Sequence, residues 1–393
     1  MKNAGNAAVF VYSKMGKAMK RRNFFKSGAA AVALGALNLS APVHAEESPI
    51  DYEALEIEPI SRRWTEERAN RWHKTLPWIV GTNYVASYAI NQIEMWQSAT
   101  VDFKTIDSEL ALAESIGFNT VRIFAHDLLW ESERDAYFDN IRRFLDICEA
   151  RHISVVYNIF TNGGKEPSVM GPQPAPIPGV HNGEWRQTPG VEKIMNQPSR
   201  WREMEPYVKD TVSTFAEDKR ILFWEIFNEP ANNRKVKDIT GFLRYAFMWA
   251  RQVNPTQPLT ASLQYYELTP MNSFLACNSD IMTFHCYSPA PQLAAAIERL
   301  EKMRRPIVCT EWMARCLGST VKDCLPLMKE KNVGALSWGL VPGKLQTNIP
   351  WTHLVKENPA NADIWFHDYF DENHKPYDPE EIELIKKLSG VKE

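Results

Sequence analysis

Apolar runs alternate with amphipathic segments along most of the chain, and this alternation predicts the secondary structure. Segments whose apolar residues recur every three or four positions have the periodicity of helices, as in the segment that carries Ile106 and Leu110 and stops at Gly117. Runs rich in β-branched and aromatic residues have the length of strands. Eight such runs lie at residues 78–87, 119–126, 153–160, 221–230, 258–264, 280–288, 306–312 and 334–340.

The order of these elements predicts the fold class. Each strand is followed by a helix or by a loop and a helix, and strands that are apolar throughout indicate a parallel sheet buried on both faces. Eight such units over about 270 residues fit a (β/α)8 TIM barrel better than an open sheet. We therefore expect an α/β barrel in a single domain at residues 71–393, preceded by an N-terminal lead at 46–70.

The N-terminus has the features of an export signal. A basic segment with paired arginines, KRRNFFK at residues 20–26, precedes a short alanine-rich apolar run and a small-residue cleavage site that ends at Ala45. This pattern predicts a twin-arginine signal peptide at 1–45, which is removed on export to the periplasm or the exterior. The run is too short for a membrane span. Met15 and Met19 are alternative starts to Met1.

Charge and cysteine content narrow the partners. Residues 1–45 hold seven of the 45 basic residues and no acid, so the mature chain has 38 basic against 48 acidic residues. A net charge near −10 argues against nucleic acid or an anionic membrane as partner. The six cysteines show no CxxC spacing, which makes a zinc site unexpected, and Cys148, Cys286 and Cys309 fall in apolar stretches typical of buried thiols. The sequence does not indicate an oligomeric state.

Polar residues at the ends of the strands are the candidates for chemistry, because a barrel gathers its catalytic groups at the carboxyl ends of its strands. No strand is followed by G-x-G-x-x-G, which weakens a dinucleotide site. The strand-end residues are Asn83, Tyr84, Arg122, His126, Asn228, Glu229, His285, Tyr287, Glu311 and Trp338.

Two of these residues, Glu229 and Glu311, follow strands four and seven, which can face each other across a barrel mouth. Facing carboxyls about 5–5.5 Å apart serve retaining glycoside hydrolysis, one as acid/base and the other as nucleophile. Arg122 and Tyr287 can keep the nucleophile ionised, and Trp338 offers a flat face for a sugar ring. Structural alternatives remain: Arg122 can pair with Glu225 in the core, and the other polar groups can be satisfied strand ends.

The ordered set resembles clan A glycoside hydrolases, and most of all the family 5 cellulase-like enzymes and the proteins called 1,4-β-xylanase-like. The set comprises Arg122, Asn228-Glu229-Pro230, His285-x-Tyr287, Glu311 and Trp338. The resemblance covers roughly residues 75–390. Around Asn228 it does not extend beyond the NEP triplet.

The resemblance implies a role for each residue of the set. Glu229 is the expected acid/base and Glu311 the expected nucleophile, while Asn228 binds the sugar 2-hydroxyl. Arg122 and Tyr287 orient and ionise Glu311. His285 contacts the substrate or the acid/base, and Trp338 forms the floor beneath the sugar. The resemblance implies a carbohydrate substrate and neither a metal nor an organic cofactor.

Two long loops depart from the cellulase pattern. The loop after the third strand runs from Thr161 to about Asn196, and another follows the eighth strand; loops of this length are usually functional. Their aromatic residues His181, Trp185, Trp351 and His353 can close one end of a groove, which favours action on chain ends over internal cleavage. Glu94, after the first strand, can bind a hydroxyl or form a surface salt bridge.

The leading expectation is a retaining hydrolase of β-glycosidic bonds. Alternatives are a transglycosylase with the same site, a carbohydrate-binding barrel without catalysis, and an unrelated barrel enzyme such as a metal-dependent lyase that uses His126 and His285. The acid pair argues against a binding protein, and the histidines lack an evident ligand spacing. The sequence does not specify the sugar.

Overall fold

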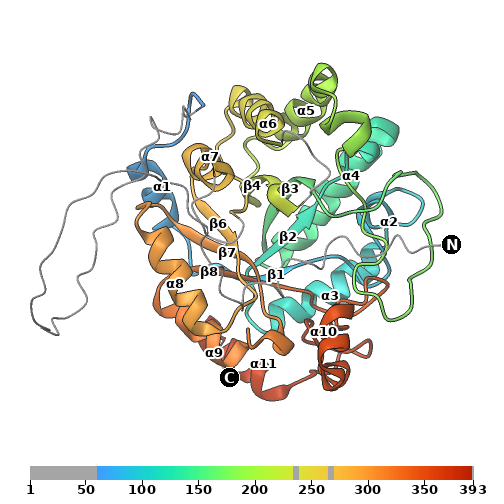
Figure 1. Cartoon of the computed structure of the whole chain (residues 1–393), viewed down its shortest axis with the longest axis vertical. Coiled ribbons are helices and arrows are strands. Elements are labelled where there is room, and N and C mark those ends of the chain that lie inside the picture. Colours follow the sequence, from blue (N-terminus) through green and yellow to red (C-terminus); the bar gives the residue numbers. More distant parts are fainter. Residues whose placement is uncertain (1–59, 233–238, 264–269, 392–393) are drawn as a thin grey trace, which may run out of the picture. The chain divides into compact units, whose positions relative to one another are not determined.

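The computed structural model describes residues 60–232, 239–263 and 270–391 of the 393-residue chain. In this part all eight predicted strands form, and they pair in parallel in the order β5-β4-β3-β2-β1-β8-β7-β6. The two ends of this order meet at a parallel bridge between Leu263 and Phe284, where Leu263 N donates to Thr283 O at 2.8 Å. The predicted (β/α)8 barrel is thereby confirmed (Figure 1).

The strands lie within the predicted runs or extend them by one residue, and most are shorter than the runs. Their bounds are β1 Val80–Asn83, β2 Thr120–Phe124, β3 Ser154–Thr161, β4 Ile221–Asn228, β5 Leu259–Thr260, β6 Met282–His285, β7 Ile307–Trp312 and β8 Gly334–Trp338. The first run ends four residues earlier than predicted, because the chain leaves the sheet after Asn83 and begins the loop that leads to the helix at Gln92–Trp96.

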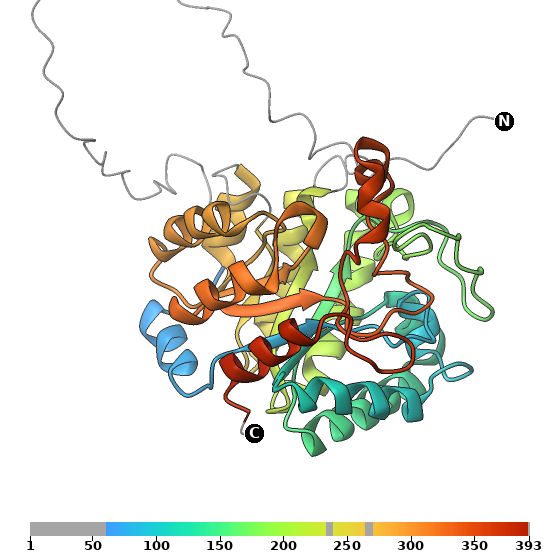
Figure 2. The same ribbon diagram turned by 90° about the horizontal axis from the view of Figure 1, so that it is seen from below.

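Helices cover the outside of the barrel (Figures 1 and 2). The α-helices are α1 Glu66–His73, α2 Gln92–Trp96, α3 Phe103–Ser115, α4 Asp127–Ala150, α5 Glu205–Thr214, α6 Ile239–Val253, α7 Pro270–Asn278, α8 Ala290–Glu301, α9 Val321–Glu330, α10 Thr352–Glu357 and α11 Pro379–Ser389. Shorter helical turns are η1 Val191–Met195, η2 Pro198–Met204, η3 Pro230–Asn232, η4 Arg315–Leu317 and η5 Pro359–Asp363.

One predicted helix is divided. The segment around Trp201 to Phe215 begins as the 3-10 turn η2 and continues as α5, with Pro206 at the second position of the α-helix. Proline fits the first turn of a helix, where its missing N–H is not needed, and this places the start of α5 close to Pro206.

The described part of the N-terminal lead, from residue 60 onward, packs at the bottom of the barrel. Trp64 packs with strand-start residues of the barrel interior, among them Ile79, Leu222 and Val308. Its backbone N–H donates to the buried carboxylate of Asp280 at 2.7 Å. The chemistry expected at the mouth therefore lies at the other end of a filled interior, as in other TIM barrels.

The cysteines form no disulfides. All six cysteines are free, and Cys148, Cys286 and Cys309 are buried as predicted. Among the described residues, every helix is too short or too polar to cross a membrane. The predicted signal peptide at 1–45 and most of the lead lie outside the described residues, so these domain limits stay predictions.

Candidate active site

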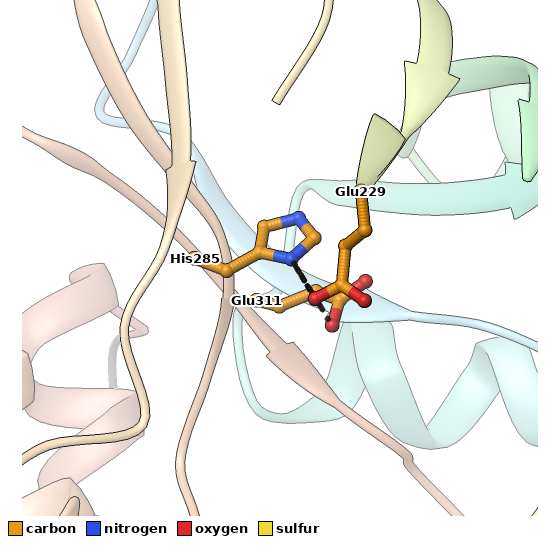
Figure 3. A group of neighbouring side chains, drawn as sticks. All are labelled: Glu229, His285 and Glu311. Atoms are coloured by element: carbon orange, nitrogen blue, oxygen red, sulfur yellow. Dashed lines mark hydrogen bonds and ion pairs between the residues drawn. The ribbon is translucent and has the colours of Figure 1, made fainter. Parts of the chain in front are cut away.

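Glu229 and Glu311 approach each other at the carboxyl end of the barrel. Glu229 directly follows β4, and Glu311 is the penultimate residue of β7 (Figure 3). Between them lies His285, the last residue of β6. Its Nδ1 is 2.8 Å from Glu229 Oε1 and 3.4 Å from Glu311 Oε2. One donor atom from each of the three side chains lies within 4.8 Å of the others.

The backbone at this point is unusual in two ways. Glu229 has a φ of 48°, a left-handed conformation that residues with side chains adopt rarely and that often marks a functional site. Register shifts also interrupt the pairing of β6 with β7 at His285 and the pairing of β7 with β8 beside Glu311. Such bulges re-aim side chains and are common beside active sites.

Arg122, from the middle of β2, holds the site together beneath the glutamates. Its NH1 donates to Glu311 Oε1 at 2.9 Å and to Asn83 Oδ1 at 2.6 Å, and its NH2 donates to Asn228 Oδ1 at 2.6 Å. Its Nε donates to Glu225 Oε2 at 2.6 Å. The core pairing with Glu225 and the site contact with Glu311 both exist, since one planar guanidinium reaches both carboxylates.

Tyr287 and Arg122 each hold one oxygen of Glu311. The hydroxyl of Tyr287 donates to Oε2 at 2.8 Å, while Arg122 donates to Oε1. Asn228 is oriented through its Nδ2, which donates to Thr161 Oγ1 at 3.1 Å. Arg122, Asn228, Tyr287 and Glu311 therefore form one hydrogen-bonded network. The contacts of His285 with Glu311 and Glu229 extend this network to six of the seven candidates.

Trp338 lies at the end of β8 in an aromatic cluster. It contacts Phe124 and Trp185 edge to face, with ring centroids 5.5 and 6.1 Å apart, and only 6% of its surface is exposed. Its contact residue Phe124 lies against the guanidinium of Arg122 at 4.7 Å. The cluster places Trp338 beside the network, and the loop after β3 covers much of it.

The electrostatics of the free site centre on His285. Burial pushes the pKa of Glu229 upward, but the hydrogen bond and positive charge of His285, with Asn232, outweigh burial and lower it. Burial raises the pKa of Glu311, and the charge of Glu229 adds to the rise against His285 and Arg122. Burial pushes the pKa of His285 down, but the two glutamates reverse this and raise it. The free site thus favours a charged His285 beside an ionised Glu229.

Glu229, His285 and Glu311 are also the kinds of ligand that zinc accepts. However, the guanidinium of Arg122 lies 2.9 Å from Glu311, and a cation is disfavoured beside it. His126, considered above as a metal ligand, does not join the group. It caps α4 by accepting from Leu128 N, and its Nε2 lies 3.0 Å from Ser168 Oγ.

Three residues that support Glu229 were not among the sequence candidates. Ser262 Oγ, after β5, accepts from Glu229 N at 3.0 Å, and Asn232 Nδ2 donates to Glu229 Oε2 at 2.7 Å. Asn162 Nδ2 donates to the carbonyl oxygens of Glu229 and Pro230. Ser262 and Asn162 follow strands, so a fuller survey of strand ends would have found them. Asn232 depends on the turn after Pro230, which no sequence pattern specified.

The loop residues lie where the two long loops meet. Trp185 packs on Trp338, and Trp351 lies 5.7 Å from Tyr287 between ring centroids. His353 stacks on Trp351. Glu94 forms a salt bridge with Lys344, which was one of the two roles predicted for it. The Glu94 carboxylate is largely buried, whereas a surface salt bridge was predicted.

The fold is a (β/α)8 barrel, and solved glycoside hydrolases, including family 5 enzymes, resemble this structure. An exo-β-1,4-mannosidase from Opitutaceae bacterium strain TAV5 superposes with a TM-score of 0.55 at 16% identity over 80% of this chain. The chain spans 59% of the length of that enzyme. No family model and no curated protein matches the sequence.

Two further structures show the same likeness. A variant of GH5_18 from Streptomyces cattleya, in complex with Manβ1-4GlcNAc, has a TM-score of 0.55 at 11% identity and covers 79% of this chain and 80% of its own. A β-mannanase from the blue mussel Mytilus edulis has a TM-score of 0.50 at 12% identity and covers 71% and 90%. At these identities the likeness establishes the fold.

Proposed function

We propose that the protein is a retaining hydrolase of β-glycosidic bonds. The observation that carries this proposal is the proximity of Glu229 and Glu311: one carboxylate oxygen of each lies within 4.8 Å of the other, and His285 Nδ1 contacts both side chains. Retaining enzymes hold their carboxyls about 5–5.5 Å apart, whereas inverting enzymes leave roughly 6.5–9.5 Å for a water molecule. The solved mannosidase and mannanase of the same fold support the reaction class.

In the first step, Glu311 attacks the anomeric carbon and the bond to the leaving oxygen breaks. The electron pair goes to that oxygen, which takes a proton from Glu229. Tyr287 and Arg122 each donate to one oxygen of Glu311 and so favour its ionised, attacking form. Asn228, fixed by Arg122 and Thr161, can hydrogen-bond the 2-hydroxyl of the sugar.

In the second step, a water molecule attacks the same carbon and gives its proton to Glu229, which releases Glu311. Glu229 must carry a proton at the start, but in the free site the proton favours His285. We infer that His285 Nδ1 passes it to Glu229 Oε1 across their 2.8 Å contact when the sugar binds. Glu229 regains a proton from water in this step, and the proton returns to His285 Nδ1 when the product leaves, which restores the starting state.

Export by the twin-arginine route belongs to the same proposal. The basic and apolar segment at residues 20–45 supports it, and a periplasmic or secreted hydrolase would meet carbohydrate outside the cytoplasm. Fractionation of cells that produce the full chain, with Arg21→Lys and Arg22→Lys as the matched variant, tests this. Retention of the double variant in the cytoplasm is expected.

The test of function is hydrolysis by the chain that begins at residue 46. The substrates are aryl β-glycosides of mannose, glucose, xylose and galactose, and β-1,4-linked oligosaccharides, with product anomers followed by NMR. We expect a retained anomer and a loss of roughly 10²–10⁴-fold in Glu229→Gln and Glu311→Gln. An inverted product contradicts the role of Glu311. Sugar binding without hydrolysis across the panel indicates a binding barrel.

A further inference from the structure

The two long loops are joined to each other across one side of the barrel mouth. We call this structure the wall and define it as residues 162–190 of the loop after β3 together with residues 341–351 of the loop after β8. Asn182 N donates to Leu345 O at 2.9 Å. Gln346 accepts from Gly179 N at 3.0 Å through Oε1 and donates through Nε2 to Ile177 O and Val180 O.

The wall is braced from behind by α2 and its cap. Gln92 exchanges two hydrogen bonds with the backbone of Arg186, at 2.9 and 3.2 Å. Glu94 pairs with Lys344 of the loop after β8. In Figure 2 the loop after β3 and the segment around α10 lie side by side, in agreement with these contacts. The wall is therefore a fixed part of the fold, since several bonded segments must separate to open it.

The wall reaches the residues that would contact the sugar. Trp185 contacts Trp338, and Trp351 contacts Tyr287, the residue that holds Glu311. Beside Trp338, between the loops after β1 and β8, the remaining cavity is about 10 Å³. That is roughly the space of one water molecule, whereas ligand pockets typically have about 300–1,000 Å³. This cavity beyond Trp338 is therefore too small for a second sugar unit.

The position of the wall relative to Glu229 sets the direction of the substrate. Glu229 must contact the leaving oxygen, so the leaving group lies on the β4 side. In the strand order β8 lies four strands from β4 in either direction, which places Trp338 and residues 341–351 of the wall opposite Glu229. The loop after β3 starts beside Glu229, where Asn162 donates to the Glu229 carbonyl oxygen, and it crosses the mouth to meet residues 341–351. The sugar that forms the covalent intermediate therefore has the wall at its non-reducing end.

We propose, on the basis of the function proposed above, that the enzyme acts only on chain ends. It would remove one β-linked sugar at a time from the non-reducing end of short oligosaccharides and glycosides. The wall leaves room for a single sugar unit on its side of the scissile bond, and the rest of the chain extends past Glu229. Specificity for a free terminal 4-hydroxyl group follows, because any extension there meets the wall.

The test compares two β-1,4-linked pentasaccharides of the sugar that the aryl glycoside panel identifies. Both carry a label at the reducing end, and one is also 4-O-methylated at the non-reducing end. We expect the uncapped chain to lose single units in sequence and the capped chain to be cut at least 100-fold more slowly. Equal rates, or labelled mono- to trisaccharides as first products, overturn the inference.

Gln346→Ala removes three bonds that join the wall and is expected to narrow the discrimination against the cap by tenfold or more. Gln292→Ala, on the exposed surface of α8, is the matched control and should leave the discrimination unchanged. An unaltered ratio in Gln346→Ala contradicts the role of the wall. Internal cleavage that Glu229→Gln abolishes overturns the wall alone, whereas the absence of hydrolysis on every substrate overturns the proposed function and this inference with it.

Discussion

His285 lies 2.8 Å from Glu229 and 3.4 Å from Glu311, so one imidazole nitrogen contacts both carboxyls of the site. This nitrogen can carry one proton, which it donates toward the carboxyls. The two flanking carboxylates stabilise the positively charged ring, because opposite charges lie close together. The pKa of His285 is raised accordingly. In the proposed reaction, the proton that cleavage needs is therefore stored on a side chain that does not itself contact the leaving group.

This arrangement predicts the pH dependence of kcat/KM. In the wild type, the proton that the site loses last as the pH rises belongs to His285, whose pKa is raised above its ordinary value of 6.5. In His285→Asn an amide can still donate to Glu229, but the last proton must sit on a carboxyl group. The basic limb of the pH profile should therefore move to lower pH. An unchanged basic limb in the variant would exclude His285 as the proton store.

The two glutamates can be assigned by azide rescue on an aryl β-glycoside. Glu229→Ala should lose roughly 10²–10⁴-fold in activity and regain about tenfold or more with azide, giving a β-glycosyl azide. Glu311→Ala should give an α-glycosyl azide, because azide then replaces the nucleophile directly. NMR of the products makes the distinction. The opposite anomers would exchange the roles, as the pKa directions of the free site alone would suggest.

Arg122 is predicted to stabilise the fold as well as the site. Arg122→Lys keeps a charge, but the lysine ammonium group cannot reach Asn83, Asn228, Glu225 and Glu311 together. Buried oxygens are then left without hydrogen-bond donors. We expect the free energy of unfolding to fall by about 3–5 kcal/mol, as measured in urea.

The matched control for Arg122 is Arg134→Lys on the surface of α4. Arg134 is 48% exposed in its side chain and pairs with Asp135 and Asp210. Its replacement should change stability by no more than about 0.5 kcal/mol. Similar losses in the two variants would show that the buried network adds nothing beyond an ordinary ion pair.

Asp368 gives the fold its own pH dependence. Burial raises the pKa of this carboxyl from 3.8 to about 7, although Thr347 Oγ1 donates to it at 2.7 Å. The unfolded chain loses this proton near pH 4 and the folded chain near pH 7, so ionisation costs stability as pH rises through that window. Asn cannot ionise, so in Asp368→Asn the fall in the free energy of unfolding between pH 4 and pH 8 should be smaller by roughly 2–4 kcal/mol.

Urea unfolding of the wild type and Asp368→Asn at both pH values measures the effect. Asp363→Asn, an exposed acid in the neighbouring turn, serves as the control and should leave the pH dependence as it is. Parallel pH curves for the wild type and Asp368→Asn would mean that Asp368 is not the titrating group.

The barrel was predictable because its information is local. Each strand is a continuous apolar run, and the alternation with helices permits few topologies. The residues at strand ends, such as Glu229 and Glu311, were found for the same reason. Their partner contacts were harder: a left-handed Glu229 and the bulges beside His285 and Glu311 arise from tertiary packing that no periodicity encodes.

The two long loops show more clearly which contacts the sequence alone does not predict. Trp185 and Trp351 were predicted to close one end of the site, and they do lie against Trp338 and Tyr287. The bonds that hold them, through Gln346 and the backbone of the loop after β3, join residues more than 160 positions apart. Such pairings depend on the folded barrel to bring the two loops together.

The described part of the lead, which packs at the bottom of the barrel, also determines where the protein can be attached to a tag or a support. Ile60 N donates to Asn278 Oδ1 ahead of β6, and Ser389, at the end of α11, lies beside Gly117 ahead of β2. Both ends of the described chain therefore leave from the face opposite the two glutamates. A fusion partner, an affinity tag or a solid support attached at either end of the described chain would leave the mouth open.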